Sequence, residues 1–131
     1  MNINDAKNVL KQYWGYDDFR GLQADIIRCC VSGKNTVGLL PTGGGKSICY
    51  QIPGLLYPGL TIVISPLVAL MEDQHNGLVK RGIKSYHFKG SYSPRKLDEA
   101  FRNLRYGNYK FAFFAPERIA NPLFLEYLSH A

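Results

Sequence analysis

The chain has 131 residues, of which 46% are hydrophobic and 20% are charged, and its net charge is +6. This length allows one domain, and the composition is ordinary for a globular protein. No apolar run approaches the roughly 20 residues that a membrane helix needs, and the N-terminus lacks the basic and apolar regions of a signal peptide. We therefore expect no membrane association and a cytoplasmic location.

The positive charge is concentrated in one stretch of the sequence. Between Lys80 and Lys110, nine basic residues stand against two acidic ones, whereas the rest of the chain is close to neutral. A solvated helix face would explain any single lysine of this stretch. The cluster as a whole favours a polyanion as partner.

The first third of the chain predicts two helices. Asp5 is a candidate N-cap for a helix over residues 6–13, and residues 22–31 carry apolar side chains at helical spacing. Between these helices, four aromatic residues alternate with a glycine and two aspartates, which is typical of a loop.

A short apolar run at residues 36–40 is followed by a glycine-rich turn and by a predicted helix that ends near Leu56. The order strand, glycine-rich turn and helix is the context that a phosphate-binding loop requires. Glycines let the backbone approach an anion closely, and the N–H groups at the helix start face it. The candidate phosphate-binding residues are Thr42, Gly43, Gly44, Gly45, Lys46 and Ser47.

Two residues of this loop have chemical roles in phosphate binding. We expect Lys46 to reach the β- and γ-phosphates and the Ser47 hydroxyl to ligate Mg²⁺. Leu40 stands where the strict loop pattern has a glycine. The alternative is a flexible glycine-rich turn that merely ends in Lys-Ser.

The rest of the chain alternates strands with helices. We expect strands at residues 61–64, 83–88 and 110–115, the first covered on both faces because its residues are β-branched. Predicted helices at 67–81 and 95–106 follow the first two, the second capped by Ser93-Pro94. A last helical region at 116–128, interrupted by Asn121-Pro122, follows the third. This alternation predicts an α/β fold with a parallel sheet flanked by helices.

Four motifs together resemble the N-terminal part of RecQ-type DNA helicases of superfamily 2. They are Gly15-Tyr16…Phe19-Arg20…Gln23, the loop and helix from Pro41 to Pro53, the segment from Ser65 to Gln74, and Ala115-Pro116-Glu117-Arg118. The resemblance covers nearly the whole chain and implies an incomplete RecA-like domain. In superfamily 2, a residue other than glycine is common at the position of Leu40.

The resemblance also implies site residues. Tyr16, Arg20 and Gln23 match an adenine-recognition motif, in which the Gln amide pairs with adenine while a ring or guanidinium stacks on it. Ser65-Pro66 and Arg118, with Lys89 in the loop after residues 83–88, are expected to contact DNA at strand ends. Taken alone, the first cluster would be core aromatics beside a surface arginine. Arg118 could equally pair with a neighbouring side chain.

The same resemblance predicts the ATP-binding part of an ATP-dependent helicase that moves 3′ to 5′ on DNA, in a bacterial nucleoid or a nucleus. We expect residues 1–33 to form a helical lead-in and residues 34–131 an α/β unit without the family's D-E-A-H strand. The chain then lacks that motif's acids and the second RecA-like domain, so we expect no turnover from it alone. The alternatives are another superfamily 2 member, such as an RNA helicase, and a non-catalytic nucleotide- or DNA-binding module.

Overall fold

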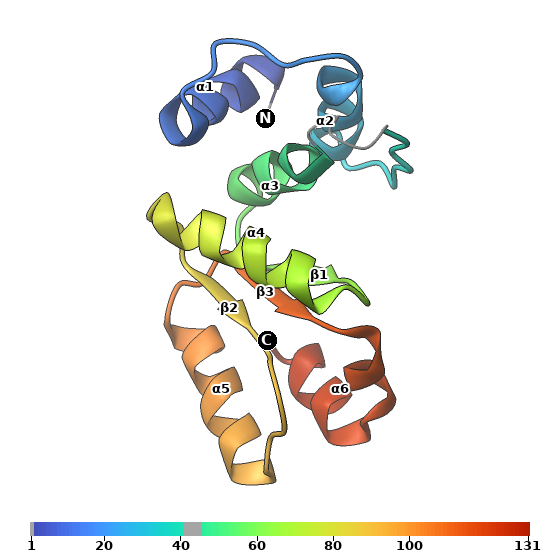
Figure 1. Cartoon of the computed structure of the whole chain (residues 1–131), viewed down its shortest axis with the longest axis vertical. Coiled ribbons are helices and arrows are strands. Elements are labelled where there is room, and N and C mark those ends of the chain that lie inside the picture. The colour runs from blue at the N-terminus through green and yellow to red at the C-terminus, as the bar shows by residue number, and fades with distance from the viewer. Residues whose placement is uncertain (1, 41–45) are drawn as a thin grey trace. The chain divides into compact units, whose positions relative to one another are not determined.

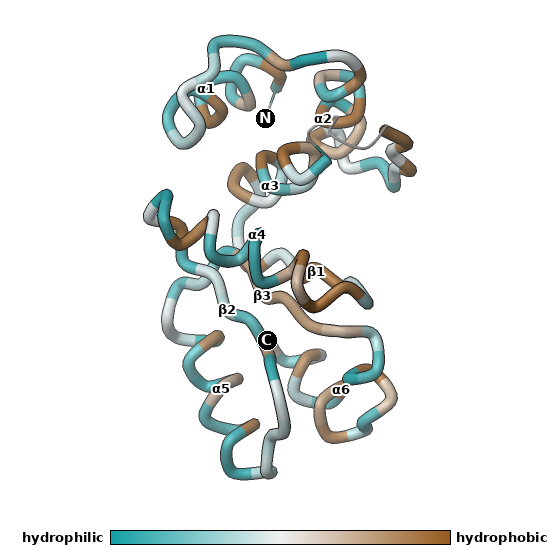
Figure 2. The backbone as a smooth tube through the Cα atoms, viewed as in Figure 1, coloured by the Kyte–Doolittle hydropathy of each residue, from teal (hydrophilic) through white to brown (hydrophobic). Residues whose placement is uncertain are grey.

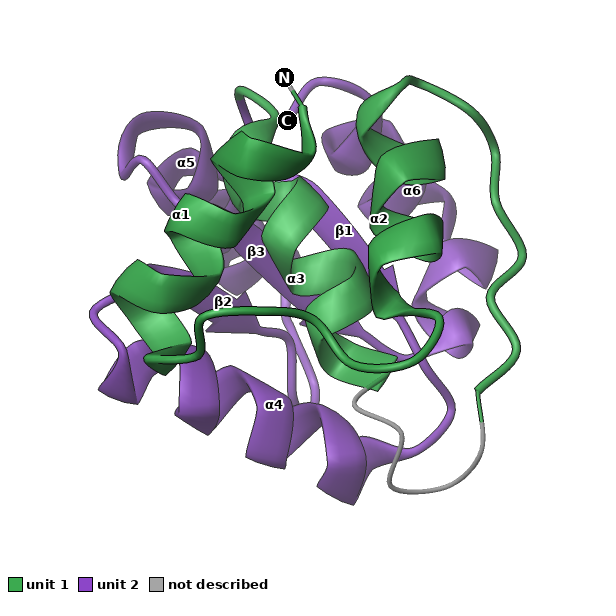
Figure 3. Ribbon diagram, turned by 90° about the horizontal axis from the view of Figure 1, so that it is seen from above, with its two compact units in different colours: residues 1–58 green, residues 59–131 purple. Residues whose placement is uncertain are grey.

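The computed structural model describes residues 2–40 and 46–131. The chain divides into two compact units, residues 1–58 and residues 59–131, each with a core of its own (Figures 1 and 3).

The first unit consists of helices within its described residues. They pack around a small apolar core formed by Ala6, Leu10, Ile27 and Ile52. The Tyr57 hydroxyl, just after the last helix, donates a 2.6 Å hydrogen bond to the carbonyl oxygen of Cys30. The helices are α1 (Ile3–Trp14), α2 (Gln23–Val31) and α3 (Lys46–Leu56).

Helix α1 begins earlier than its sequence predicted, and the expectation that Asp5 is its N-cap is wrong. Asn2 is the N-cap, and its side-chain oxygen accepts a 3.0 Å hydrogen bond from the Asp5 backbone N–H. The Asp5 carboxylate in turn accepts one from the Asn2 backbone N–H. This reciprocal pair satisfies two backbone donors at the helix start, which explains the additional first turn.

The strand predicted at residues 36–40 does not form, which corrects the sequence prediction. These residues have neither helical nor strand structure, and the side chains of Val37 and Leu39 are 89% and 82% exposed. A single strand cannot satisfy its own backbone hydrogen bonds, so an apolar run becomes a strand only beside a partner. No strand of the described residues pairs with this run.

The second unit is built on a three-stranded parallel sheet in which β3 lies between β1 and β2 (Figure 1). Its strands are β1 (Thr61–Ile64), β2 (Ser85–His87) and β3 (Phe111–Phe114). Its helices are α4 (Val68–Lys80), α5 (Pro94–Tyr106), the 3₁₀ helix η1 (Pro116–Ala120) and α6 (Pro122–Ser129). The predicted α/β architecture with a parallel sheet is confirmed for this unit.

Strand β3 is buried along its whole length because both faces of the sheet are covered there. Phe113 lies 6.3 Å, between ring centroids, from His75 of α4. Phe114 belongs to an aromatic cluster with Phe101 of α5 and Phe124 of α6, whose rings lie 5.0 to 5.2 Å apart in successive pairs. Helix α4 therefore covers one face, and α5 and α6 cover the other.

Strand β1 differs from the expectation of a strand covered on both faces. Thr61 and Val63 are half-buried, whereas Ile62 and Ile64 are 36% and 46% exposed. The strand is at the edge of the sheet, and among the described residues only β3 pairs with it. The described part of the unit therefore covers only one face of β1, although the residues of this strand are β-branched.

Two histidines that are separate in the sequence come together between α4 and β2. The ring centroids of His75 and His87 are 6.0 Å apart, and His75 Nδ1 lies 2.8 Å from the Ser85 hydroxyl. Nδ1 of His87 is buried and has no hydrogen-bond partner among the residues that the structure describes. Burial lowers the pKa of both rings, and the cationic Lys89 nearby lowers them further, against an opposing effect of Glu72.

We predict that the free energy of unfolding falls as the pH drops from about 7 to about 5. Because the pKa of each histidine is lower in the folded chain, the unfolded chain binds protons at a higher pH than the folded chain does. Acidification therefore favours the unfolded chain, whereas at neutral pH the folded chain keeps its full stability. Urea unfolding at several pH values measures this effect.

The double variant His75→Gln and His87→Gln is expected to flatten the pH dependence in this range. His130→Gln is the matched control, because His130 is exposed at the end of α6. A double variant with the same pH dependence as the unsubstituted chain would contradict the assignment.

Candidate functional site

The three residues expected to recognise adenine line one pocket in the first unit. Tyr16, Arg20 and Gln23 share a cavity of about 150 Å³ with Leu10 of α1 and Ile48 of α3. Asp18, whose carboxylate lies 3.4 Å from the Lys7 ammonium, completes the lining. The pocket therefore combines apolar walls, an aromatic ring, a guanidinium group and an amide, which are the groups that hold a flat, polar ring.

The amide of Gln23 is held in a fixed orientation at the start of α2. Gln23 is 2% exposed, and its Oε1 accepts a 2.8 Å hydrogen bond from the Arg20 backbone N–H. The Gln23 backbone N–H donates back to the Arg20 carbonyl oxygen at 3.1 Å. The side chain thus has a structural role in the turn before α2 as well as a position in the pocket.

Of the candidate phosphate-binding loop, the structure describes only the last two residues. Thr42, Gly43, Gly44 and Gly45 lie outside the described residues. Lys46 and Ser47 form the first turn of α3, Lys46 exposed and Ser47 half-buried. Ile48, the next residue of α3, lines the pocket with Gln23, so the start of this helix adjoins the candidate adenine pocket.

The residues expected to contact nucleic acid lie in the second unit, at one edge of its sheet. Ser65-Pro66 follows β1, Lys89 follows β2 after one residue, and Arg118 lies in η1 just after β3. Because the three strands are parallel, their carboxyl ends share an edge. Cross-strand bonds continue there, since the Ser65 N–H donates to the carbonyl oxygen of Phe114 at 3.3 Å.

Arg118 links two of the loops at this edge. Its Nη2 donates a 2.7 Å hydrogen bond to the Gly90 carbonyl oxygen, and its guanidinium carbon lies 5.0 Å from the Tyr92 ring centroid. A cavity of about 440 Å³ lies beside it, with Glu117 also in the lining. Arg118 is thus held by a carbonyl oxygen and a ring, and within the described residues it forms no ion pair with a carboxylate.

The other two candidates at this edge have partners of their own. The Lys89 ammonium lies 3.2 Å from a Glu72 carboxylate oxygen in an exposed ion pair. The Ser65 hydroxyl oxygen accepts a 3.1 Å hydrogen bond from the Leu67 N–H, which shapes the turn into α4. Exposed pairs of this kind contribute little to stability, so Lys89 can exchange Glu72 for another anion.

Two residues of these sites were missed in the sequence. Ile48 lines the candidate adenine pocket, and the ring of Tyr92 lies against Arg118. The position of Ile48, two residues after Lys46, was the available signal, because a phosphate-binding loop would place the first turn of the following helix beside the bound nucleotide. Tyr92, an aromatic side chain in a polar loop, carried a weaker signal of the same kind.

Comparison with known proteins gives one consistent result. The DEAD/DEAH box helicase family matches residues 20–130. The chain is 41% identical over 127 residues to the ATP-dependent DNA helicase RecQ of Bacillus subtilis, covering 96% of this chain and 22% of that protein. It is 41% identical over 126 residues to the probable ATP-dependent DNA helicase RecS of the same organism, covering 96% and 25%. With RecQ of Pasteurella multocida the identity is 37% over 125 residues, covering 95% and 20%.

The chain thus spans a fifth to a quarter of the length of these relatives. Among the described residues, no helix has the length and apolar character needed to cross a membrane. The family match covers far more than half of the chain, and the expected resemblance to RecQ helicases is confirmed. The chain belongs to the DEAD/DEAH box helicase family.

Proposed function

We propose that this chain is the ATP-binding part of an ATP-dependent DNA helicase of RecQ type that moves 3′ to 5′ along DNA. The observation that carries the proposal is the pocket in which Tyr16, Arg20 and Gln23 meet the first turn of the helix that begins with Lys46-Ser47. An adenine site and a phosphate site side by side are what ATP requires.

The residues present fit Mg²⁺-ATP chemically. Gln23 offers a buried amide for the base, while the Tyr16 ring and the Arg20 guanidinium offer flat surfaces for stacking. Lys46 would neutralise the β- and γ-phosphates, with the backbone N–H groups of Thr42 to Gly45 around them. The Ser47 hydroxyl would be a ligand of Mg²⁺, which draws charge from the phosphates when it is bound.

The sheet edge with Ser65, Lys89 and Arg118 is the proposed nucleic-acid contact. Lys89 is exposed, and the cavity of about 440 Å³ lies beside Arg118. Arg118 would donate two parallel hydrogen bonds to a phosphate. Its bond to the Gly90 carbonyl oxygen would link the position of that phosphate to the Gly90 loop. The charge of the stretch from Lys80 to Lys110 supports a polyanion at this unit.

Hydrolysis of ATP also needs acidic groups that help to hold Mg²⁺ and that activate water. The described start of α3 offers a lysine and a hydroxyl for the phosphates, and the one carboxylate in the lining of the adjoining pocket, that of Asp18, is paired with Lys7. We propose that a D-E-A-H segment and a second RecA-like domain of the same protein supply the further groups that hydrolysis needs, together with strands that cover the exposed side of β1. The 131-residue chain would then bind ATP without turning it over.

We predict that Gln23→Glu weakens ATP binding and reduces the preference for ATP over GTP. Glutamate keeps the oxygen that accepts the Arg20 N–H but loses the amide donor that adenine requires, so the turn before α2 remains. Titration with fluorescent adenine and guanine nucleotides, together with thermal unfolding, separates recognition from folding.

Gln23→Ala is the contrasting variant, since it removes both the donor and the structural acceptor. It is expected to lower the melting temperature as well as the affinity, whereas Gln23→Glu lowers mainly the affinity. Equal binding of ATP and GTP by the unsubstituted chain would contradict the adenine assignment.

We predict that Lys89→Ala weakens the binding of single-stranded oligo(dT). Loss of one phosphate contact is expected to reduce the slope of log affinity against log salt by about 0.7. Fluorescence anisotropy at several salt concentrations measures both the affinity and this slope.

Lys11→Ala is the matched control, because Lys11 is also an exposed lysine in a surface ion pair, at 3.5 Å from Asp17. Both substitutions change the net charge equally. The same loss of affinity in the two variants would argue for a general charge effect and against a contact at Lys89.

A further inference from the structure

Much of the positive charge of the second unit lies away from the edge assigned to DNA. Of the basic residues between Lys80 and Lys110, the proposed function uses only Lys89. Lys84 precedes β2, and Arg102 and Arg105 lie in the last turns of α5. They belong to the edge at which β2 and β3 begin, opposite to the one with Lys89 and Arg118.

Lys84 and two tyrosines form one hollow at this opposite edge. The cavity, about 410 Å³ in volume, is lined by Lys84, Arg102, Asn103, Tyr106, Gly107 and Tyr109. The Lys84 ammonium donates a hydrogen bond to the Gly107 carbonyl oxygen and lies 4.5 Å from the Tyr109 ring centroid. These two contacts hold a positive charge beside an aromatic ring.

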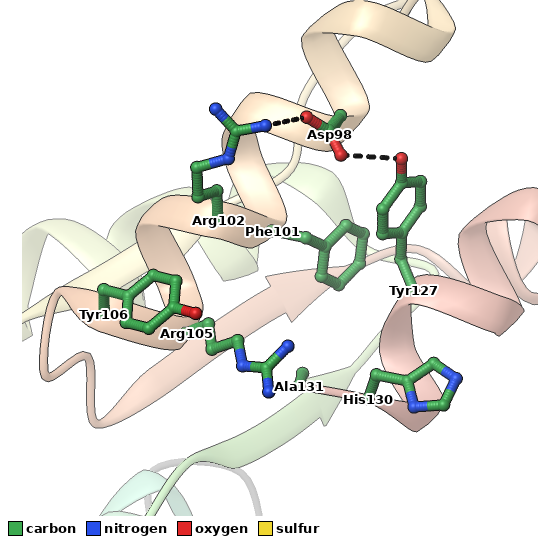
Figure 4. A pocket seen from close by; sticks show the side chains of 8 residues that line it. All are labelled: Asp98, Phe101, Arg102, Arg105, Tyr106, Tyr127, His130 and Ala131. Carbon is green, nitrogen blue, oxygen red and sulfur yellow. Dashed lines mark hydrogen bonds and ion pairs between the residues drawn. The ribbon is translucent and has the colours of Figure 1, made fainter.

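A second hollow adjoins the first and shares Arg102 and Tyr106 with it. It has a volume of about 180 Å³ and extends from α5 to the end of α6 (Figure 4). Asp98 is the only acidic side chain among the residues that line the two hollows, all of which belong to the described part of the chain. Its carboxylate already accepts hydrogen bonds from Arg102 and from the Tyr127 hydroxyl.

Tyr106 is the residue between the hollows, and it is 73% exposed. The guanidinium carbon of Arg105 lies 5.7 Å from its ring centroid. Most of α5 is hydrophilic (Figure 2), and the ring of Tyr106 at its end is not stabilised by burial in the core. Together Lys84, Arg102, Arg105, Tyr106 and Tyr109 form a surface that we call the basic-aromatic surface.

This surface is distinct from the proposed DNA contact at the other edge. Helix α5 begins after the Gly90 loop and ends at Tyr106, and its 13 residues extend for about 20 Å. A nucleotide bound at one edge of the sheet therefore cannot also contact the opposite edge.

We propose that the basic-aromatic surface is a second binding site for single-stranded nucleic acid. Arginine and lysine side chains follow the phosphates, and an exposed tyrosine supplies a stacking face for an unpaired base. A duplex has no exposed base faces for Tyr106, and the carboxylates of an acidic protein segment supply charge but no stacking face. The combination of charge and rings favours a single strand, and the inference goes beyond the proposed function.

The test is the binding of labelled oligo(dT) to the 131-residue chain by fluorescence anisotropy. Tyr106→Ala is expected to weaken binding at least about fivefold, and Tyr106→Phe to stay within about twofold of the unsubstituted chain. Arg105→Ala is expected to reduce the salt slope by about 0.7. Both positions are exposed, and alanine favours helix, so circular dichroism should show α5 intact.

Arg28→Ala is the charge-matched control, since Arg28 is likewise an exposed arginine in the last turn of a helix. The proposal is overturned if Arg105→Ala behaves like Arg28→Ala, or if Tyr106→Phe weakens binding as much as Tyr106→Ala. Displacement of oligo(dT) by poly-glutamate at equal charge would also overturn it, in favour of an acidic protein partner. Loss of binding in Tyr106→Ala but not in Lys89→Ala would uphold this site and count against the DNA contact at the other edge.

Discussion

The burial of β3 is the constraint on which the second unit depends. This strand hydrogen-bonds to β1 on one side and to β2 on the other, both in parallel, and its phenylalanines fill the core on both faces. Truncating one buried phenylalanine to alanine typically costs about 3–5 kcal/mol. That is a large share of the roughly 5–15 kcal/mol by which a domain is stable. A change in β3 would therefore disturb every loop that the sheet positions.

The parallel order gives the unit two chemically different edges. Loops after the strands bring Lys89 and Arg118 together, whereas loops before them carry Lys84 and the end of α5. In the first unit, the corresponding constraint is the bond between Gln23 and the Arg20 backbone. The buried amide of Gln23 stabilises the turn before α2 and also lines the candidate adenine pocket. Folding and the proposed adenine recognition therefore depend on the same residue, which is why conservative variants are needed to separate them.

Local patterns in the sequence predicted most helices and the three strands of the sheet, because a cap such as Ser93-Pro94 and an apolar run each specify structure in their own segment. The strand expected at residues 36–40 could not be judged in this way, since pairing depends on partners distant in sequence. Asn2 was overlooked because either Asn2 or Asp5 is a good N-cap and only the geometry distinguishes them. The motif predicted Tyr16, Arg20 and Gln23 as a group. Ile48 needed the packing of α3 beside them.

The most direct test of the central claim is the equilibrium binding of Mg²⁺-ATP to the 131-residue chain and to Lys46→Ala, with phosphate release followed in parallel. A lost charge-assisted hydrogen bond to phosphate is worth about 1.5–3 kcal/mol, so the affinity should fall at least about tenfold. The account predicts binding that depends on Lys46 and no release of phosphate. Equal affinity of the two chains for Mg²⁺-ATP would contradict the proposed nucleotide site. Release of phosphate that Lys46→Ala abolishes would contradict the proposal that the 131-residue chain binds ATP without hydrolysing it.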